Sequence, residues 1–461
     1  MPTFLNTDIL FFLLLLGLAV LVCQASRREH LRRPWRKVAS STPAMVSLVI
    51  LLAYLAIAVL DSLRFLPSEN GAGQFRSEPV SLLDAWLRPI KSRTEKTYSA
   101  PLASYAYAKE MIRQPDGSER WAYPRLRHGG AHLADPERDN PGDILRAGLK
   151  GLGAGFMIWL VPAGLWLAWL QRRNRGKYAA TRAAAVRGET EVPWRAIGLT
   201  LLFIRLADGV LGELGLKYHV LGTDKVGEDV FCQSLKSIRT GLLIGTLTTF
   251  ATLPLALGFG ILAGYLRGWV DDAIQYLYTT LNSVPGVLLI AAAMLVMQGY
   301  MARHEDEFAS LALRADFRLL ALCLILGLTS WTGLCRLLRA ETLKLRELEY
   351  VQAAQALGVR RGMILLRHIL PNLFHLVLIS VALDFSSLVL AEAVLSYINI
   401  GVDPTMESWG NMINGARLEM ARDPVVWWSL AAAFLFMFAL VLPANLFADV
   451  ARDAFDPRRG D

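Results

Sequence analysis

Charged residues are scarce in this 461-residue sequence, and their scarcity excludes an ordinary soluble protein. Asp, Glu, Lys and Arg make up 19% of the chain, whereas hydrophobic residues make up 54%. Soluble domains carry about 25% charged residues and lack apolar runs long enough to cross a bilayer. The composition therefore predicts a membrane protein whose chain crosses the bilayer several times.

Cysteine is also rare, and its spacing argues against two kinds of site. The four cysteines are scattered, and at least three lie in or beside apolar stretches: Cys23, Cys232, Cys323 and Cys335. A disulfide framework or a zinc site would need cysteines at paired spacings. We therefore expect neither a disulfide nor a bound metal.

Motifs for catalysis are missing as well. The sequence has no G-x-x-x-x-G-K-[ST] phosphate-binding loop, so the chain is not expected to hydrolyse ATP by that route. The acidic run from His304 to Glu307 lacks a second histidine at zinc-binding spacing, which favours a solvated turn. We predict that the chain is not an enzyme and uses no cofactor.

We interpret nine apolar stretches as membrane spans, at about 9–23, 45–63, 151–170, 194–216, 240–266, 274–298, 318–338, 373–398 and 427–449. The stretch 194–216 carries Arg205, Asp208 and Glu213. It is either a span with its charges turned inward or a helix at the membrane interface. Between the second and third spans, residues 64–150 are polar and rich in turn residues, which predicts a loop insertion. The basic runs at the other ends of the flanking spans place this insertion outside the cytoplasm.

Basic residues indicate which side of the membrane each end occupies. The net charge is +8, but Lys and Arg gather in short runs beside apolar stretches, as orientation signals do, so no nucleic acid is expected. The first basic run follows the first apolar run, which is the reverse of the order in a signal peptide. We therefore expect an uncleaved first span, an N-terminus outside and a C-terminus in the cytoplasm. The basic segments placed inside are Arg27–Lys37, Arg172–Lys177, Arg267 and Arg458–Arg459.

The polar stretch Glu349–Asn372 separates two apolar runs and predicts two helices joined by a turn. Tyr350, Ala353, Ala354 and Leu357 are spaced as one face of a helix. Gly358 then occupies the position of a left-handed C-terminal cap. The second helix is expected to stop at Pro371, which has no backbone N–H to continue it.

This stretch resembles the cytoplasmic "EAA" loop in permease subunits of ABC importers. The loop has the pattern E-A-A, three residues, G, then I and L-P, and Gln352 replaces its usual Glu. The resemblance implies that the loop docks on an ATP-hydrolysing subunit. The residues that it implies for this contact are Gln352, Ala353, Ala354, Leu357, Gly358, Ile364, Leu370 and Pro371.

Three further segments resemble the subfamily that imports dipeptides, oligopeptides and nickel. They are HVLGTDKVGED from His219, LAEAVLSYINIG from Leu390 with Trp409-Gly410 after it, and NLFADVARDAFDP from Asn445. The resemblance implies an all-α, type I permease core over 218–461, with the coupling loop at 340–372. The remaining chain is then divided into membrane spans at 1–63, the insertion at 64–150 and additional spans at 151–217.

The family implies a function and a set of partners. The expected function is a permease subunit that forms the path for di- and oligopeptides across the cytoplasmic membrane. Import of nickel or another small solute is the alternative, and a secondary carrier or channel is a further one. The implied partners are a second permease subunit, one or two ABC ATPase subunits, an extracytoplasmic substrate-binding protein and membrane lipid.

Two acidic residues in the span 373–398 are candidates for the translocation path. Asp384 and Glu392 are eight residues apart, so a helix places them roughly on one face. Charges at membrane depth usually face a cavity or a partner. The pair could therefore line the path and meet a peptide's amino terminus, or it could pair with another helix through Arg205.

Overall fold

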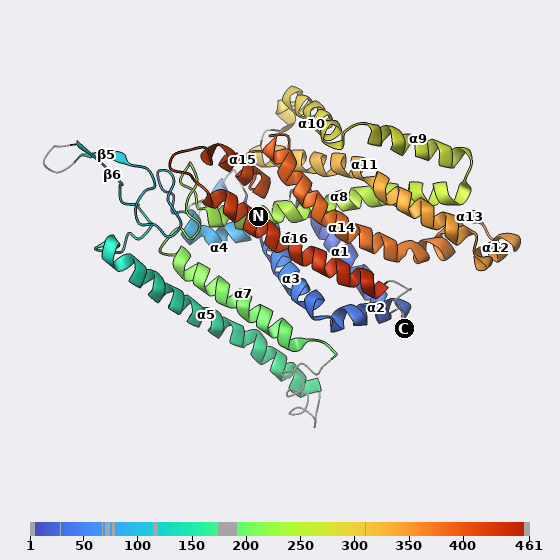
Figure 1. The fold of residues 1–461 in the computed structure, drawn as a ribbon, viewed down its shortest axis with the longest axis horizontal. Coiled ribbons are helices and arrows are strands. Elements are labelled where there is room, and N and C mark those ends of the chain that lie inside the picture. The colour runs from blue at the N-terminus through green and yellow to red at the C-terminus, as the bar shows by residue number, and fades with distance from the viewer. Residues whose placement is uncertain are drawn as a thin grey trace. The chain divides into compact units, whose positions relative to one another are not determined.

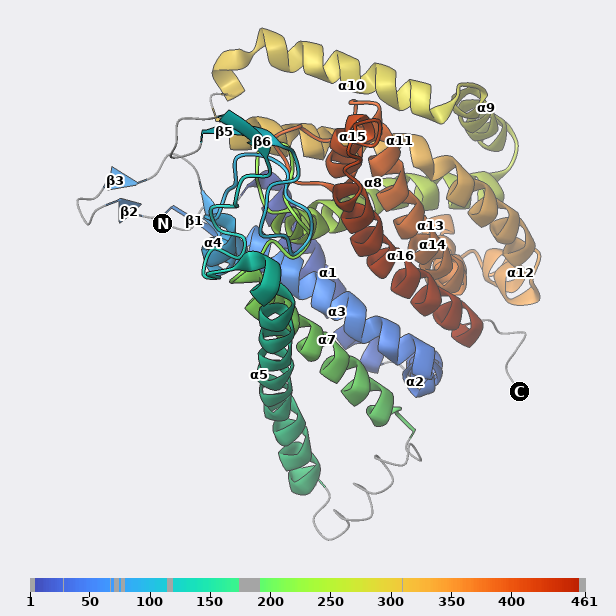
Figure 2. The same ribbon diagram turned by 60° about the vertical axis from the view of Figure 1, so that its left-hand side comes forward.

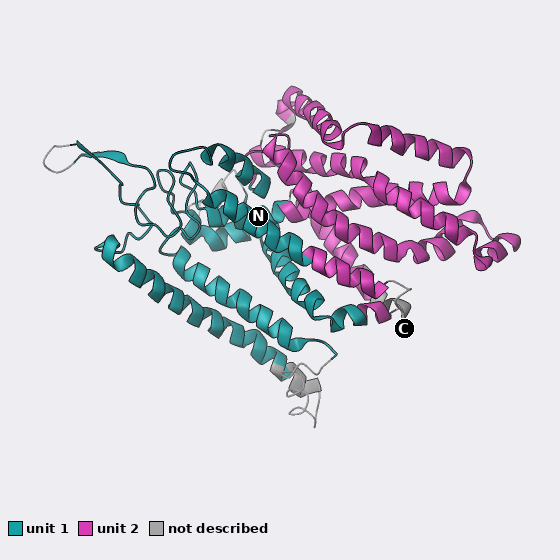
Figure 3. Cartoon of the chain, viewed as in Figure 1, with its two compact units in different colours: residues 1–3, 36–240, 407–443 teal, residues 4–35, 241–406, 444–461 magenta. Residues whose placement is uncertain are grey.

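The computed structural model describes residues 5–27, 29–66, 68–69, 74–75, 79–113, 119–173, 191–308 and 310–455 (Figure 1). Long helices dominate, which confirms the expected all-α class. The chain forms two compact units (Figure 3). Unit 1 contains residues 1–3, 36–240 and 407–443, and unit 2 contains residues 4–35, 241–406 and 444–461. Because each unit combines separated stretches, neither coincides with a segment expected from the sequence, and those segments stay predictions.

Unit 1 contains helices from both ends of the chain: α3 (Thr42–Ser62), α4 (Leu82–Lys91), α5 (Pro136–Arg173), α7 (Trp194–Gly215) and α15 (Trp409–Glu419). It also includes part of α2 (Glu29–Ser40), the start of α8 (Val230–Leu266) and the first part of α16 (Trp428–Phe455).

Unit 2 contains α1 (Asn6–Arg27), the rest of α8, α9 (Trp269–Ser283), α10 (Gly286–Arg303), the 3-10 turn η1 (Glu305–Phe308), α11 (Leu311–Arg346), α12 (Glu349–Ala356), α13 (Arg361–Ile364), the π-helical turn η2 (Leu365–Ile369), α14 (Leu370–Tyr397) and the end of α16. The basic run after Arg173 and the tail from Asp456 onward lie outside the described residues.

Among the residues that the structure describes, paired strands occur only in the polar segment 64–150, and all are short and antiparallel. They are β1 (Arg64–Phe65) with β4 (Val80–Ser81), β2 (Ser68–Glu69) with β3 (Gln74–Phe75), and β5 (Glu110–Arg113) with β6 (Glu119–Ala122). In the last pair Met111 lies opposite Trp121. The segment thus contains hairpins and turns, as its many turn residues predict, together with α4 and the first part of α5.

Six helical stretches are long and apolar enough to cross a membrane, counted over the described residues: Thr42–Ser62, Pro136–Trp166, Val230–Leu266, Gly286–Arg303, Arg361–Tyr397 and Trp428–Phe455. A shorter apolar stretch covers Asn6–Val20 in α1. These seven correspond to seven of the expected spans. The other two expected spans are the helices α7 and part of α11, which are not among the six. The multi-pass helical class is confirmed.

The span expected at 274–298 is divided into two helices. α9 ends at Ser283 and α10 begins at Gly286. Val284 between them is extended, with φ −96° and ψ 133°. Pro285 explains the break, because the proline ring disfavours the helical conformation of the residue before it.

The prediction that a helix ends at Pro371 is wrong. The chain turns from α13 through η2 directly into α14, and Pro371 lies in the first turn of α14. The amide of Leu370 donates to the carbonyl of Leu365, five residues back. This wider turn supplies the room that a proline ring needs, and a missing N–H near a helix start removes no bond. The π-helical turn therefore lets the helix continue.

α5 and α7 lie side by side through glycine backbones (Figure 2). A Cβ at Gly151 would lie 2.5 Å from the carbonyl oxygen of Gly209. A Cβ at Gly155 would meet the carbonyl of Arg205 in the same way. Further along, Trp159 Nε1 donates to the carbonyl of Gly198 at 3.1 Å. The two helices thus pack at a separation that side chains at these glycines would not allow.

Gly209→Ala tests this packing. The new Cβ would overlap the carbonyl of Gly151, so we expect the free energy of unfolding to fall by about 1–3 kcal/mol. Gly212→Ala is the matched control, because nothing lies within 4 Å of its Cβ position. The free energy of unfolding of that variant should be unchanged or higher by up to about 1 kcal/mol. Thermal unfolding of the full chain in detergent measures both, and equal Tm values would contradict the packing.

Candidate functional site

The turn after α12 is set by one residue with a left-handed backbone. Gly358 has φ +75°, as its predicted role as a cap requires. Its amide donates to the carbonyl of Gln355 at 3.0 Å, and the amide of Val359 donates to Ala354 at 3.1 Å. These two bonds form a Schellman motif, which satisfies the last carbonyls of α12. The chain therefore reverses sharply between α12 and α13.

One face of this segment is anchored in the core of unit 2. Val351, Ala354, Ile364 and Ile369 are buried in a cluster that also contains Trp331 and other α8 and α11 side chains. Apolar burial of this extent stabilises each large side chain by roughly 1.5–3 kcal/mol. The segment is therefore held firmly by its own unit and is not a free loop.

The opposite face is exposed and contains most of the residues predicted to contact an ATPase. Gln352, Ala353, Leu357, Gly358 and Pro371 are exposed, and 83% of Leu357 is accessible. By contrast, Ala354 and Ile364 are buried and Leu370 is partly buried. The predicted set thus divides into residues available for contact and residues that hold them in place.

The exposed face extends further than the sequence predicted. Met363 and Leu366 are 52% and 67% exposed and lie just after the turn. Two large apolar side chains on a polar segment are a signal that sequence reasoning missed. We define the coupling surface, named for its predicted role, as Gln352, Ala353, Leu357, Gly358, Met363 and Leu366.

Polar contacts connect α12 to α8, and α11 to α8 and α9, within unit 2. Gln355 Nε2 donates to the hydroxyl of Tyr265 at 3.2 Å, and Arg346 Nη1 donates to the carbonyl of Tyr265 at 2.7 Å. Arg339 binds Asp271 through two bonds, Nε to Oδ1 at 2.5 Å and Nη2 to Oδ2 at 2.6 Å. A displacement of α12 would therefore be passed to α8 and α11, and Arg339 connects α11 to α9.

The predicted acidic pair is divided between two environments. Asp384 lines a cavity among α8, α11 and α14. Glu392 is only 2% exposed and accepts a 2.7 Å bond from the Ser396 hydroxyl, and it does not line that cavity. Arg205, the alternative partner for this pair, instead binds Asp208 at 3.0 Å. The eight-residue spacing alone does not place both carboxylates at one site.

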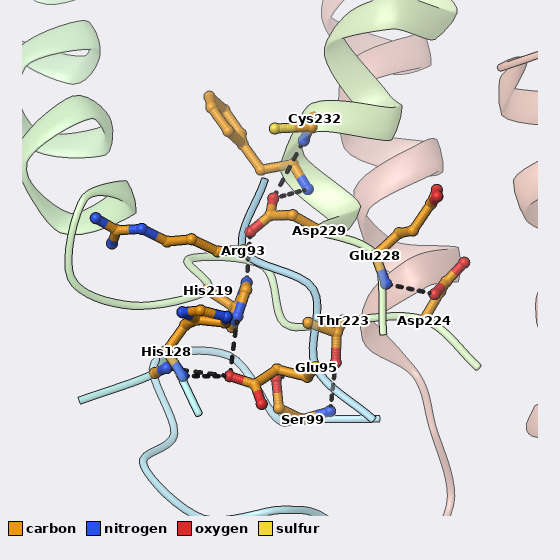
Figure 4. A network of polar contacts seen from close by, with 12 residues as sticks. Arg93, Glu95, Ser99, His128, His219, Thr223, Asp224, Glu228, Asp229 and Cys232 are labelled. Atoms are coloured by element: carbon orange, nitrogen blue, oxygen red, sulfur yellow. Dashed lines mark hydrogen bonds and ion pairs between the residues drawn. The ribbon is translucent and has the colours of Figure 1, made fainter. Parts of the chain in front are cut away.

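A second polar centre lies in unit 1, where the insertion meets the segment before α8 (Figure 4). His219 Nδ1 lies 2.8 Å from Asp229 Oδ2, and its Nε2 lies 3.6 Å from Glu95 Oε1. All three side chains are buried. Glu95 also accepts backbone bonds from Arg127, His128 and Gly129, at 2.9, 2.8 and 3.2 Å. A single carboxylate thus ties a loop of the insertion to the imidazole.

The backbone around this centre is equally specific. Gly227 has φ +82°, and a Cβ there would overlap the backbone of Glu95. Ser99 and Thr223 exchange bonds, with the Ser99 amide donating to Thr223 Oγ1 at 2.7 Å and the Thr223 amide donating to the Ser99 carbonyl at 3.1 Å. Sequence reasoning recognised the segment at His219–Asp229 but missed Glu95, which lies over a hundred residues earlier in an unremarkable stretch.

Charge explains the protonation of this centre. Burial alone would lower the pKa of His219, but its contacts with Asp229 and Glu95 outweigh it and raise that pKa to about 9. Burial alone would raise the pKa of Glu95, but His219 and the three backbone donors lower it to about 2. At neutral pH the centre is therefore an imidazolium between two carboxylates.

Comparison with known proteins adds an independent observation. The family described as binding-protein-dependent transport system inner membrane component matches residues 256–461. A glutathione transport system permease of Pectobacterium atrosepticum is 32% identical over 242 residues, which cover 52% of this chain and 73% of that protein. A dipeptide transport system permease of Lactococcus lactis is 29% identical over 244 residues, which cover 53% of this chain and 65% of that protein. An oligopeptide transport system permease of Haemophilus influenzae is 28% identical over 241 residues, which cover 52% of this chain and 71% of that protein. The residues matched by the family include the coupling surface and Asp384.

The buried centre predicts a dependence of stability on pH. The lowered pKa of Glu95 gives stability that is present above pH 4.5 and lost as the pH falls towards about 2. The raised pKa of His219 gives stability that is present below pH 6.5 and lost as the pH rises through about 9. We therefore expect this centre to stabilise the protein most between about pH 4.5 and pH 6.5.

Glu95→Gln should remove roughly 3–5 kcal/mol, because it leaves a buried imidazolium without one carboxylate. Its loss should be largest near pH 5–6 and smaller at pH 10, where wild-type His219 is itself neutral. Glu110→Gln is the matched control, since the Glu110–Lys96 pair lies at the surface and contributes about 1 kcal/mol or less. Thermal unfolding over this pH range decides the matter, and equal losses in the two variants would contradict the assignment.

Proposed function

Because the chain belongs to the family of binding-protein-dependent transport system inner membrane components, we propose that it is a permease subunit of an ATP-driven peptide importer. The observation that carries this proposal is the coupling surface, an exposed apolar face on a segment that is anchored beneath it. The permeases named for glutathione, dipeptides and oligopeptides support peptides as the substrate class. The sequence contains no phosphate-binding loop, so we assign ATP hydrolysis to partner subunits.

The mechanism follows from the contacts of α12. An ATPase that binds the coupling surface and moves on binding ATP would displace α12 together with its buried residues. Through Tyr265 and Arg346 this displacement reaches α8 and α11. The partner shifts the balance between inward- and outward-open states by its different affinity for each of them. Shape carries this docking, because Gln352 is neutral and its Nε2 donates within the chain, to the carbonyl of Glu347.

We propose the partners that such a subunit needs. They are a second permease subunit, one or two ABC ATPase subunits, an extracytoplasmic substrate-binding protein and the lipid of the inner membrane. We place the translocation path beside α14, with Asp384 and Glu392 as the acidic residues nearest to it. Asp384 is the stronger candidate because it lines a cavity.

We propose that the N-terminus and the insertion 64–150 lie outside and that the C-terminus lies in the cytoplasm. Contacts within unit 1 support this arrangement. They join three segments that the proposed orientation places outside the membrane. The hydroxyl of Tyr107 donates to the carbonyl of Val425 at 2.9 Å, and Trp428 Nε1 donates to the carbonyl of Thr223 at 2.9 Å. The insertion, the segment before α8 and the segment before α16 thus meet outside.

Cysteine labelling tests the orientation. In a variant without the four native cysteines, Lys109→Cys should react with an impermeant maleimide in intact spheroplasts. Arg360→Cys, on the proposed cytoplasmic side, should react only after lysis. Both positions are exposed, so the membrane alone decides their reactivity. The opposite pattern would overturn the orientation.

Gly358→Val tests the proposed function at the coupling surface. A left-handed conformation costs a non-glycine residue about 1–2 kcal/mol, and more for a branched one. Nothing lies within 4 Å of its Cβ position, so the strain acts on the turn alone. The wild-type transporter should take up labelled di- and tripeptides, and this uptake and the peptide-stimulated ATPase activity should fall together in the variant at unchanged membrane levels.

Two further variants complete this experiment. Ala353→Asp places a charge on the exposed face and should reduce both activities by a different route. Gly362→Val adds the same side chain as Gly358→Val to open space without a positive φ, so it should retain most of the activity. Full peptide uptake in both Gly358→Val and Ala353→Asp would show that this surface does not couple ATP hydrolysis to transport.

A further inference from the structure

A small cavity within unit 2 is lined by residues of α8, α11 and α14. Its volume is about 60 Å³. Its polar lining consists of one carboxylate and four hydroxyls, from Asp384, Thr249, Thr252, Ser330 and Ser387. Two of the helices that form it, α8 and α14, are among the candidate membrane spans. Four apolar side chains complete the lining, those of Leu253, Leu334, Val381 and Leu388, so the polar groups form one part of a mixed surface.

The hydroxyl hydrogens of this lining are largely engaged by the backbone. Thr249 Oγ1 donates to the carbonyl of Gly245 at 2.7 Å, and Thr252 Oγ1 donates to Thr248 at 3.0 Å. Ser387 Oγ donates to the backbone carbonyl of Asp384 at 2.8 Å. A hydroxyl that has given its hydrogen can act towards a ligand only as an acceptor. The cavity thus presents mainly acceptors.

The charge of the lining has one sign. Asp384 lies in the middle of α14 and makes no side-chain hydrogen bond or ion pair with any residue that the structure describes. None of the described residues that line the cavity is Lys, Arg or His. A carboxylate at membrane depth is costly unless it has a partner. An anion would be repelled here, and an amide would leave most of these acceptors unused.

We propose that this cavity binds the protonated amine of the transported solute. A primary ammonium has three N–H donors and one positive charge, which match one carboxylate and a set of hydroxyl acceptors. The volume admits such a head group but not a whole dipeptide. This inference rests on the proposed import function, and it assigns the role to Asp384 and not to Glu392, whose carboxylate accepts from Ser396. The amine could be the amino terminus of a peptide or a lysine side chain.

Protection of a cysteine tests the site without relying on transport. In the complete transporter, without native cysteines, Ser330→Cys places a thiol in the lining at an exposed position. Trialanine should slow its alkylation by N-ethylmaleimide, whereas N-acetyl-trialanine, which lacks the amine, should not. N-acetyl-lysyl-dialanine distinguishes the two sources, because it protects only if a side-chain ammonium is accepted.

The role of Asp384 is tested in the same assay. Asp384→Asn should raise the trialanine concentration needed for protection by about tenfold or more, the effect of losing a charge-assisted hydrogen bond. Its alkylation rate without peptide should match that of the parent, which shows that the cavity is intact. Glu341→Gln is the control, an acid-to-amide change in an exposed pair with Lys344. It should need the same trialanine concentration for protection as the parent.

The outcomes are separable from the proposed function. Protection by N-acetyl-trialanine equal to that by trialanine would overturn the site, and so would full protection in Asp384→Asn. Uptake of labelled trialanine by the wild-type transporter tests the import function itself. Protection without uptake would support the amine site and contradict peptide import. Uptake without amine-dependent protection would support peptide import and contradict the amine site.

Discussion

The structure depends on the exclusion of polar groups from a hydrocarbon environment. In a membrane interior every backbone N–H and C=O must be bonded within the protein, and helices achieve this along a single stretch of chain. The long apolar helices follow from that constraint. It also accounts for where helices break, since Val284 and Pro285 interrupt the chain only between two complete helices, and η2 rearranges bonds at Pro371 without abandoning them.

Polar contacts are concentrated where helices begin and end. In unit 1, Asp229 bonds the first amides of α8, those of Phe231 and Cys232, at 2.9 and 3.2 Å, while its other oxygen holds His219. In unit 2, Arg339, Arg346 and Tyr265 join the ends of α8 and α11 to the start of α9 and to α12. One arrangement fixes an insertion, and the other fixes a surface on which a partner could act. Each arrangement includes an ion pair that is at least partly buried, His219 with Asp229 and Arg339 with Asp271, and removing one member of such a pair is destabilising.

Much of the fold could be predicted because apolar runs and basic runs are local signals. The cap at Gly358 was predictable for the same reason, since its role depends on residues within one turn. The failure at Pro371 was also local in origin, because proline ends a helix only if the turn keeps its usual width. Glu95 and Tyr265 could not be found in this way. Their partners, His219 and Gln355, lie many residues away in the sequence, and neither belongs to a pattern of its own.

The sequence by itself determined that this protein is a helical membrane permease, and it predicted a docking segment at Glu349–Asn372, because composition, charge runs and short motifs are properties of neighbouring residues. The tertiary structure decided which of those residues face outward, with Leu357 exposed and Ala354 buried on the same helix. It also decided that Asp384 and Glu392 have different surroundings, although helical spacing puts them on one face. Spacing fixes the direction of a side chain around its own helix, but its surroundings depend on which other helices pack against that face.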